Sequence, residues 1–198
     1  MRPTDLRDRV AGDLDGCRLR PVDATHALLE TDAGPLCWWE VRQERRRLLQ
    51  LQVSAFHLDG PATTADVRVT FRHTGNVRRT GLRASVKGRD QLVGVSLRDQ
   101  LLADGELQAA SLPLDFTRFT VEPLRGRWRA TLELMGGSYV RTTFPPSGSY
   151  VRLAADQTAA LLATVRVLHR RLPVAPETLR PDPSPASDLS DHLPRRTV

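Results

Sequence analysis

Alternation of apolar and polar residues marks 127–134 as a β-strand with one buried face and one face in solvent. Strands of a parallel sheet are buried on both faces and read as continuous apolar runs, so this pattern favours an antiparallel sheet covered on one side. The apolar positions are Trp128, Ala130, Leu132 and Leu134, and they alternate with Arg127, Arg129, Thr131 and Glu133.

Two glycines follow this strand and predict a tight hairpin. Gly136 and Gly137 can adopt the positive φ angles that such a turn needs. The inward-facing row then continues on the return strand through Val140, Thr142 and Phe144. The next two residues are prolines, which cannot donate to a ladder, so residues 145–149 are predicted to form a loop before a short strand at 150–153.

The pattern then changes to a helical period. Asp156 lies near the positive end of the expected helix dipole, and Pro173 prevents continuation of the helix. The sequence therefore predicts a long C-terminal helix whose apolar stripe packs against the sheet. The stripe consists of Leu161, Val165, Leu168 and Leu172, spaced four, three and four residues apart.

The N-terminal half predicts one short helix and three strands. The helix is expected at 5–14, where apolar residues recur every four positions, and the strands at 27–31, 36–43 and 48–58. The charged run at 44–47 is interpreted as a turn. Together the elements indicate an α+β fold, in which an antiparallel sheet of several strands packs against the long C-terminal helix and one or two shorter helices.

A further pair of alternating segments predicts a basic hairpin between residues 67 and 87, with its turn at 74–76. Like charges on one face of a hairpin cost stability unless an anion screens them, so this face is a candidate for binding an anion or an acidic partner. The alternative is an ordinary solvated face whose acidic partners come from neighbouring strands. The outward-facing positions carry Arg68, Arg72, Arg83 and Lys87.

Composition limits what these charges mean. The formal net charge is +6, and of 29 basic residues only Lys87 is a lysine. A GC-rich coding bias explains such a skew, so the placement of the arginines is more informative than their number. Binding of nucleic-acid bases is disfavoured because Phe71 points inward and leaves no aromatic platform for stacking, whereas contact with a nucleic-acid backbone stays an alternative.

The length of 198 residues and the 40% hydrophobic content suit one domain at 1–172. An internal duplication with a seam near residue 90 is suggested by the recurrence of Leu-Arg-Asp at 6–8 and at 97–99. From residue 173 onward, six prolines lie among Ser, Asp and Arg. This composition predicts a disordered Pro-rich tail at 173–198.

Motifs in the C-terminal part resemble those of an uncharacterised bacterial family. They are Gly-Gly-Ser-Tyr-Val-Arg at 136–141, Pro-Pro-Ser-Gly-Ser-Tyr-Val-Arg-Leu at 145–153, and Asp-Gln at 156–157 in the helix. In these motifs the chain is similar to the family designated domain of unknown function 3156. The resemblance implies a bacterial source, and it implies no activity, cofactor or catalytic residue.

Sequence patterns typical of catalysis or metal binding are not evident. Cys17 and Cys37 lack the close pairing of a zinc site and are interpreted as buried thiols. The five histidines are scattered, and no nucleophile elbow, phosphate-binding loop or dinucleotide motif occurs. We expect no cofactor and no metal, and a role other than catalysis is favoured. Without a leader-like or membrane-spanning run, the protein is expected to be cytoplasmic.

The sequence favours a non-catalytic binding or protein-interaction module. Such a module would either cover a protein partner or hold a small apolar ligand between the sheet and the C-terminal helix. The alternatives are binding of an anion or a nucleic-acid backbone through the basic hairpin at 68–89, and an unrecognised enzyme. The pocket for an apolar ligand would be lined by Trp128, Leu132, Phe144 and Val165.

Overall fold

The computed structural model of the protein describes residues 1–46, 48–75 and 79–172. The predicted tail at 173–198 lies outside the described residues. Within them the chain forms four helices, α1 (Pro3–Asp13), α2 (Gln91–Leu102), α3 (Gly105–Ser111) and α4 (Ala155–Arg171). The nine strands are β1 (Arg18–Pro21), β2 (His26–Thr31), β3 (Gly34–Arg46), β4 (Leu49–Ala62), β5 (Val67–Thr74), β6 (Gly81–Gly88), β7 (Phe116–Leu124), β8 (Arg127–Thr142) and β9 (Ser147–Val151).

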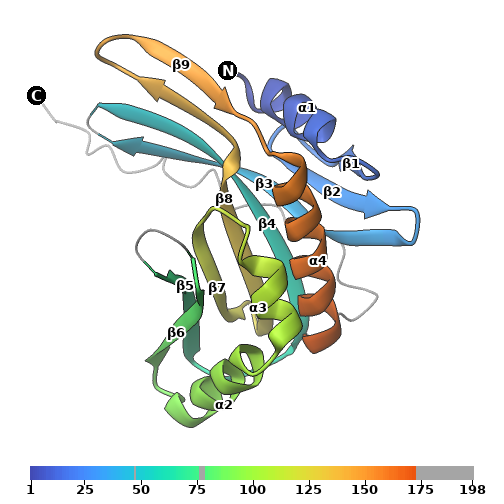
Figure 1. Cartoon of the computed structure of the whole chain (residues 1–198), viewed down its shortest axis with the longest axis vertical. Coiled ribbons are helices and arrows are strands. Elements are labelled where there is room, and N and C mark those ends of the chain that lie inside the picture. Colours follow the sequence, from blue (N-terminus) through green and yellow to red (C-terminus); the bar gives the residue numbers. More distant parts are fainter. Residues whose placement is uncertain (47, 76–78, 173–198) are drawn as a thin grey trace, which may run out of the picture.

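All nine strands join one sheet, and every described strand pair is antiparallel. The strand order is β1-β2-β3-β4-β8-β7-β5-β6, and β9 pairs with the distal part of β8 (Figure 1). The predicted α+β class and the antiparallel sheet are therefore confirmed. The predicted internal duplication stays a prediction.

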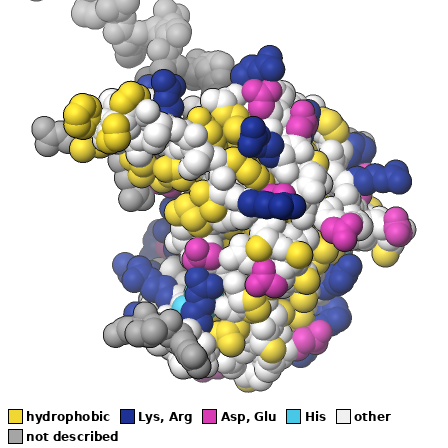
Figure 2. Space-filling view, turned by 45° about the horizontal axis from the view of Figure 1, so that its top comes forward, with side chains coloured by type: hydrophobic (Ala, Val, Ile, Leu, Met, Phe, Trp, Pro, Cys, Tyr) yellow, Lys and Arg dark blue, Asp and Glu magenta, His cyan; other side chains and the backbone are white. Residues whose placement is uncertain are grey.

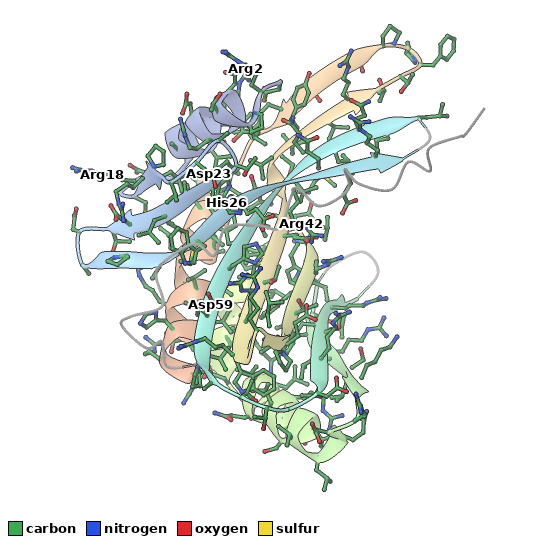
Figure 3. All side chains as sticks on the ribbon, turned by 180° about the vertical axis from the view of Figure 1, so that it is seen from behind. Arg2, Arg18, Asp23, His26, Arg42 and Asp59 are labelled. Atoms are coloured by element: carbon green, nitrogen blue, oxygen red, sulfur yellow. The ribbon has the colours of Figure 1, made fainter. Side chains whose placement is uncertain are left out.

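The helices lie on one face of the sheet. Helix α4 packs over β3 and β4, α3 packs against α4, and α2 packs against β5 and β6 (Figure 1). Seen from behind, the sheet is uncovered by helices in the described part of the chain (Figure 3). We call this side the uncovered face. No helix among the described residues has the length and hydrophobicity needed to cross a bilayer.

The core lies between the sheet and the helices, as the alternation predicts. The four residues of the predicted helical stripe are all buried there, in the same core cluster as Phe56, Phe71 and Phe119 of the strands. Phe71 and Phe119 stack with their ring centroids 4.4 Å apart. Burying each such side chain stabilises the fold by about 1.5–3 kcal/mol, so this layer holds α4 in place.

The predicted hairpin at Gly136–Gly137 is wrong. Strand β8 runs through both glycines to Thr142, and they lie in a long bulge, in which residues 135–138 stand opposite Val53: Gln52 pairs with Tyr139, but Ser54 pairs with Leu134. Of the two glycines only Gly137 has the predicted positive φ, 79°, and here a bulge uses the same backbone freedom as a turn.

Serine side chains satisfy the backbone of this bulge. The Ser54 hydroxyl donates to the Gly137 carbonyl at 2.5 Å, and the Ser138 hydroxyl donates to the Leu134 carbonyl at 2.7 Å. The indole N–H of Trp39 in turn donates to Ser54 Oγ at 3.1 Å. Because these groups are buried, each would carry a desolvation cost without its partner, and the bulge is thereby fixed in one place.

Beyond the bulge, two hairpins form an arm that projects from the body (Figure 1). We define the arm as residues 43–46 and 48–52 of β3–β4 together with residues 138–151 of β8–β9. Its hairpins are joined at their ends, where the Thr143 N–H donates to the Leu48 carbonyl at 3.0 Å. Two predicted boundaries are corrected here: Glu44–Arg46 belong to β3, and Ser147–Ser149 of the predicted loop belong to β9.

We predict that Gly137→Ala lowers the free energy of unfolding by about 1–2 kcal/mol, because an L-residue at this positive φ is strained. Urea titration followed by tryptophan fluorescence measures this. Gly12→Ala in α1 is the matched control, since an added Cβ there meets nothing within 4 Å and alanine favours a helix. Equal stability of Gly137→Ala and the native protein would contradict the role given to the bulge.

Candidate anion-binding groove

The basic hairpin β5–β6 forms with the predicted side-chain alternation. Val67, Val69 and Phe71 face the helices and are buried, whereas Arg68 and Arg72 are exposed on the uncovered face. The strand register places Arg68 opposite Lys87 and Arg72 opposite Arg83. The structure therefore brings the four predicted binding residues together on one face.

Strand β7 adds a third arginine next to this pair. Phe71 of β5 pairs with Phe119 of β7, so Arg118 is the neighbour of Arg72 on the uncovered face. Arg83, Arg72 and Arg118 thus follow one another across β6, β5 and β7, and we call them the arginine row. Arg72 and Arg83 form no ion pair with any residue of the described ranges.

The neighbouring row of the same three strands is balanced. Lys87 lies opposite Arg68, and Arg68 forms an ion pair with Glu122 of β7. Glu122 lies opposite Arg129 of β8, and the Arg129 guanidinium donates to both carboxylate oxygens of Asp59 on β4. Here acidic residues from neighbouring strands do neutralise the cations, as the alternative interpretation of the hairpin expected. In the arginine row, an acidic residue neutralises a cation only at the inner end, where β7 meets β8.

At that inner end, the Glu133 carboxylate lies between two arginines. Glu133 is on β8, and its carboxylate binds Arg42 of β3 and lies 3.3 Å from Arg118 of β7. Its side chain is only 4% exposed although no helix covers it, because the two guanidinium groups lie over it. Arg118 is 44% exposed. Its guanidinium has five donors, so it can also bind a ligand from solvent.

Two hollows border Arg118. The first, about 510 Å³, is lined by the outward side chains of β5 and β7, including Arg68, Arg72 and Arg118, and we call it the basic hollow. The second, about 380 Å³, lies between the arm and the start of β7, and we call it the apolar hollow. Both include Thr117 and Arg118 in their walls, so together they form one groove.

Hydrophobic residues of β4 and β8, some within the arm and some beside it, line the apolar hollow. They are Leu49, Leu51 and Val53 of β4 and Leu134, Met135 and Val140 of β8. The bulge at Gly136–Gly137 interrupts β8 between Met135 and Val140, so the same irregularity shapes this wall. Figure 2 shows the hollowed side of the molecule, with hydrophobic side chains above the hollow and lysine or arginine side chains below it.

The family model described as "Protein of unknown function (DUF3156)" matches residues 12–172 of the chain. The protein belongs to this family. The resemblance seen in the sequence motifs is thereby confirmed. Neither a curated protein nor a solved structure matches the chain. The DUF3156 match contains every residue of the groove, so the groove lies within the part of the chain that defines membership.

The four residues predicted to line an apolar pocket under α4 are not brought together. Leu132 and Val165 are buried in the core, and Trp128 packs partly buried against it. Phe144 lies at the end of the arm with 84% of its surface exposed. The reason is the bulge: without a turn at Gly136–Gly137, the expected inward row does not return to the helix.

Sequence reasoning missed the residues that connect the two hollows. It assigned no strand to 116–124, although Phe119 and Val121 alternate with Arg118, Thr120 and Glu122 in the half-buried pattern used elsewhere. That signal predicts a strand but not its neighbours. The pairing of β7 between β5 and β8, which completes the arginine row, comes only from the tertiary structure.

A histidine on the uncovered face links a carboxylate to a hydroxyl. His57 Nε2 lies 3.0 Å from Glu40 Oε2, and His57 Nδ1 lies 3.1 Å from Thr131 Oγ1. Because a carboxylate only accepts, Nε2–H of His57 donates to Glu40. The hydrogen bond from His57 holds the pKa of Glu40 below its ordinary value, against the opposing effect of burial. His26 lies on the same face, bonded to Asp23 (Figure 3).

None of these histidines belongs to a metal centre in the described ranges, where no group of three or more His, Cys, Asp or Glu side chains could hold an ion. Thr131, whose hydroxyl lies 3.1 Å from His57 Nδ1, is buried. Cys37 is buried, as predicted for both cysteines, and Cys17 is partly exposed.

Glu40→Gln tests the electrostatic contribution of this bond. The pKa of Glu40 is lower in the folded protein, so its carboxylate stabilises the fold above the unfolded pKa of about 4.3, and the stabilisation is lost as the pH falls through the folded value. We expect the free energy of unfolding to drop less between pH 6 and pH 3 in Glu40→Gln than in the native protein. Urea titrations at a series of pH values measure it, and parallel pH profiles would contradict the assignment.

Proposed function

We propose that the protein is a non-catalytic binding module whose groove holds a small anionic ligand with an apolar portion. The observation that carries this proposal is the arginine row, in which Arg72 and Arg83 have no acidic partner among the described residues and Arg118 shares its only one with Arg42. Like charges directly opposite each other destabilise a strand pair, and a bound anion would remove that cost.

The size of the groove favours a small ligand. Its hollows of about 510 and 380 Å³ fall in the range typical of small-molecule sites. Guanidinium groups bind carboxylates and phosphates with two parallel hydrogen bonds, so either group suits the basic hollow. The aliphatic wall contributed by Leu49, Leu51 and Val53 suits a hydrocarbon portion. An alkyl carboxylate or alkyl phosphate satisfies both hollows.

The other functions predicted from the sequence, including the favoured apolar ligand under α4, are weaker for physical reasons. The space between sheet and α4, expected to hold an apolar ligand, contains Leu132 and Val165 packed into the core. A nucleic-acid backbone could contact the arginine row, but Phe71 of the same hairpin is buried, and the other phenylalanine in the wall of the basic hollow, Phe116, is itself partly buried in the core. A protein partner on the uncovered face would have to place an acidic side chain in the same groove.

The test is calorimetric titration of dodecanoate and dodecyl phosphate into the native chain and into Arg72→Gln with Arg83→Gln. We expect affinity to fall by about tenfold or more in this variant, since a hydrogen bond to a charged group contributes about 1.5–3 kcal/mol. The fold should be unchanged or up to about 1 kcal/mol more stable, because two opposed charges are removed.

Lys87→Gln with Arg89→Gln is the matched control, since it removes two exposed cations at the other end of the same hairpin that do not belong to the arginine row. This control should bind dodecanoate as the native protein does. Equal affinity of the native protein and the Arg72, Arg83 variant would overturn the proposal, and so would equally tight binding of uncharged dodecanol. Tight, salt-sensitive binding of a single-stranded oligonucleotide with no binding of dodecanoate would favour the nucleic-acid alternative.

A further inference from the structure

The end of the arm exposes hydrophobic residues that the groove does not use. Phe144 is 84% exposed and Leu48 is 61% exposed, and Pro145 and Pro146 beside them are exposed as well. They belong to two different hairpins, which the hydrogen bond from Thr143 to Leu48 holds side by side. We call these four residues the apolar tip. An exposed apolar cluster of this kind marks a surface that contacts a partner or a membrane.

Arginines flank the apolar tip on one side of the arm. Arg45 of β3 pairs with Gln50 of β4, and Gln50 pairs with Arg141 of β8, so the two arginines lie in one row across three strands. Both are exposed. Within the described part of the arm the one carboxylate is Glu44, which lines the apolar hollow of the groove.

This combination matches the chemistry of an anionic lipid surface. Side chains such as Phe and Leu gain by leaving water for the acyl region, whereas arginines just behind them reach the level of the phosphates with their stems along the apolar surface. Each basic residue near an anionic membrane strengthens binding about fivefold. A second copy of the chain would bring arginines against arginines, so self-association through the tip is disfavoured.

We propose that the apolar tip docks the protein on anionic membranes, with Phe144 and Leu48 inserted between lipid headgroups and Arg45 and Arg141 bound to lipid phosphates. The arm projects from the body, so its end can reach a flat surface without obstruction by the helices (Figure 1). The docking residues lie outside both hollows of the groove, and this proposal does not rest on the ligand proposed for them.

The experiment is co-sedimentation of the full chain with vesicles of phosphatidylglycerol and phosphatidylcholine, compared with vesicles of phosphatidylcholine alone. We expect binding to the anionic vesicles and at least tenfold weaker partitioning of two tip variants, Leu48→Ser with Phe144→Ser and Arg45→Glu with Arg141→Glu. Both pairs are exposed, so the variants should fold, and their urea titrations check this.

Two controls separate the tip from surface properties in general. Leu92→Ser removes a leucine on α2 that is 87% exposed, more than Leu48 and about as much as Phe144. Arg18→Glu with Arg166→Glu makes the same change in net charge on β1 and α4. Both controls should bind vesicles as the native protein does. If the controls lost as much vesicle binding as the tip variants do, net charge or general hydrophobicity would explain the binding, and the proposal would be overturned.

Depth of insertion gives an independent readout. Phe144→Trp should add tryptophan fluorescence that brominated lipids quench, beyond any quenching of the native Trp38, Trp39 and Trp128. Absence of added quenching on bound vesicles would overturn insertion. The Arg72→Gln, Arg83→Gln variant should still bind vesicles, and the tip variants should still bind dodecanoate, so failure of one proposal is distinguished from failure of the other.

Discussion

The pairing of β4 with β8 is the interaction on which the rest of the structure depends. These are the two longest strands, they lie at the centre of the sheet, and their ladder continues on both sides of the bulge at Gly136–Gly137. Ser54 and Ser138 hold the bulge in register from the two strands. Because the ladder resumes after the bulge, one strand serves both the helix-covered body and the arm.

The groove follows from that continuity. Before the bulge, β8 presents Glu133 to the arginines of β3 and β7, and after it β8 presents Val140 to the apolar hollow. The charged and hydrophobic walls therefore come from adjacent stretches of one strand. An added Cβ at Gly136 would lie 2.8 Å from Leu153 and from Gln157, so the absence of a side chain also lets α4 begin close to the bulge.

Local patterns in the sequence were sufficient to predict most helices and strands and the basic face beside the groove. Period-two alternation identified β5 and β6 and put Arg68, Arg72, Arg83 and Lys87 on one face, because alternation is a local property. It could not show that β7 lies beside β5, since pairing over a sequence distance of about fifty residues depends on the whole sheet. The Gly136–Gly137 error has a related cause: positive φ serves turns and bulges alike, and only the partner strand distinguishes them.

Glu133 has a consequence for how the chain acquires its structure. Arg118 lies opposite Glu133 within the β7–β8 hairpin, but Arg42 is 91 residues away in sequence, so this hairpin alone supplies only one of the two guanidinium partners. A folding intermediate without β3 or without β7 would leave the Glu133 carboxylate with one guanidinium partner instead of two, or would leave it in water. Slipping any of the three strands by one residue would turn a charge to the wrong face of the sheet. The contacts of Glu133 with Arg42 and Arg118 thus couple the two halves of the chain into one cooperative unit and select a single register for the three strands.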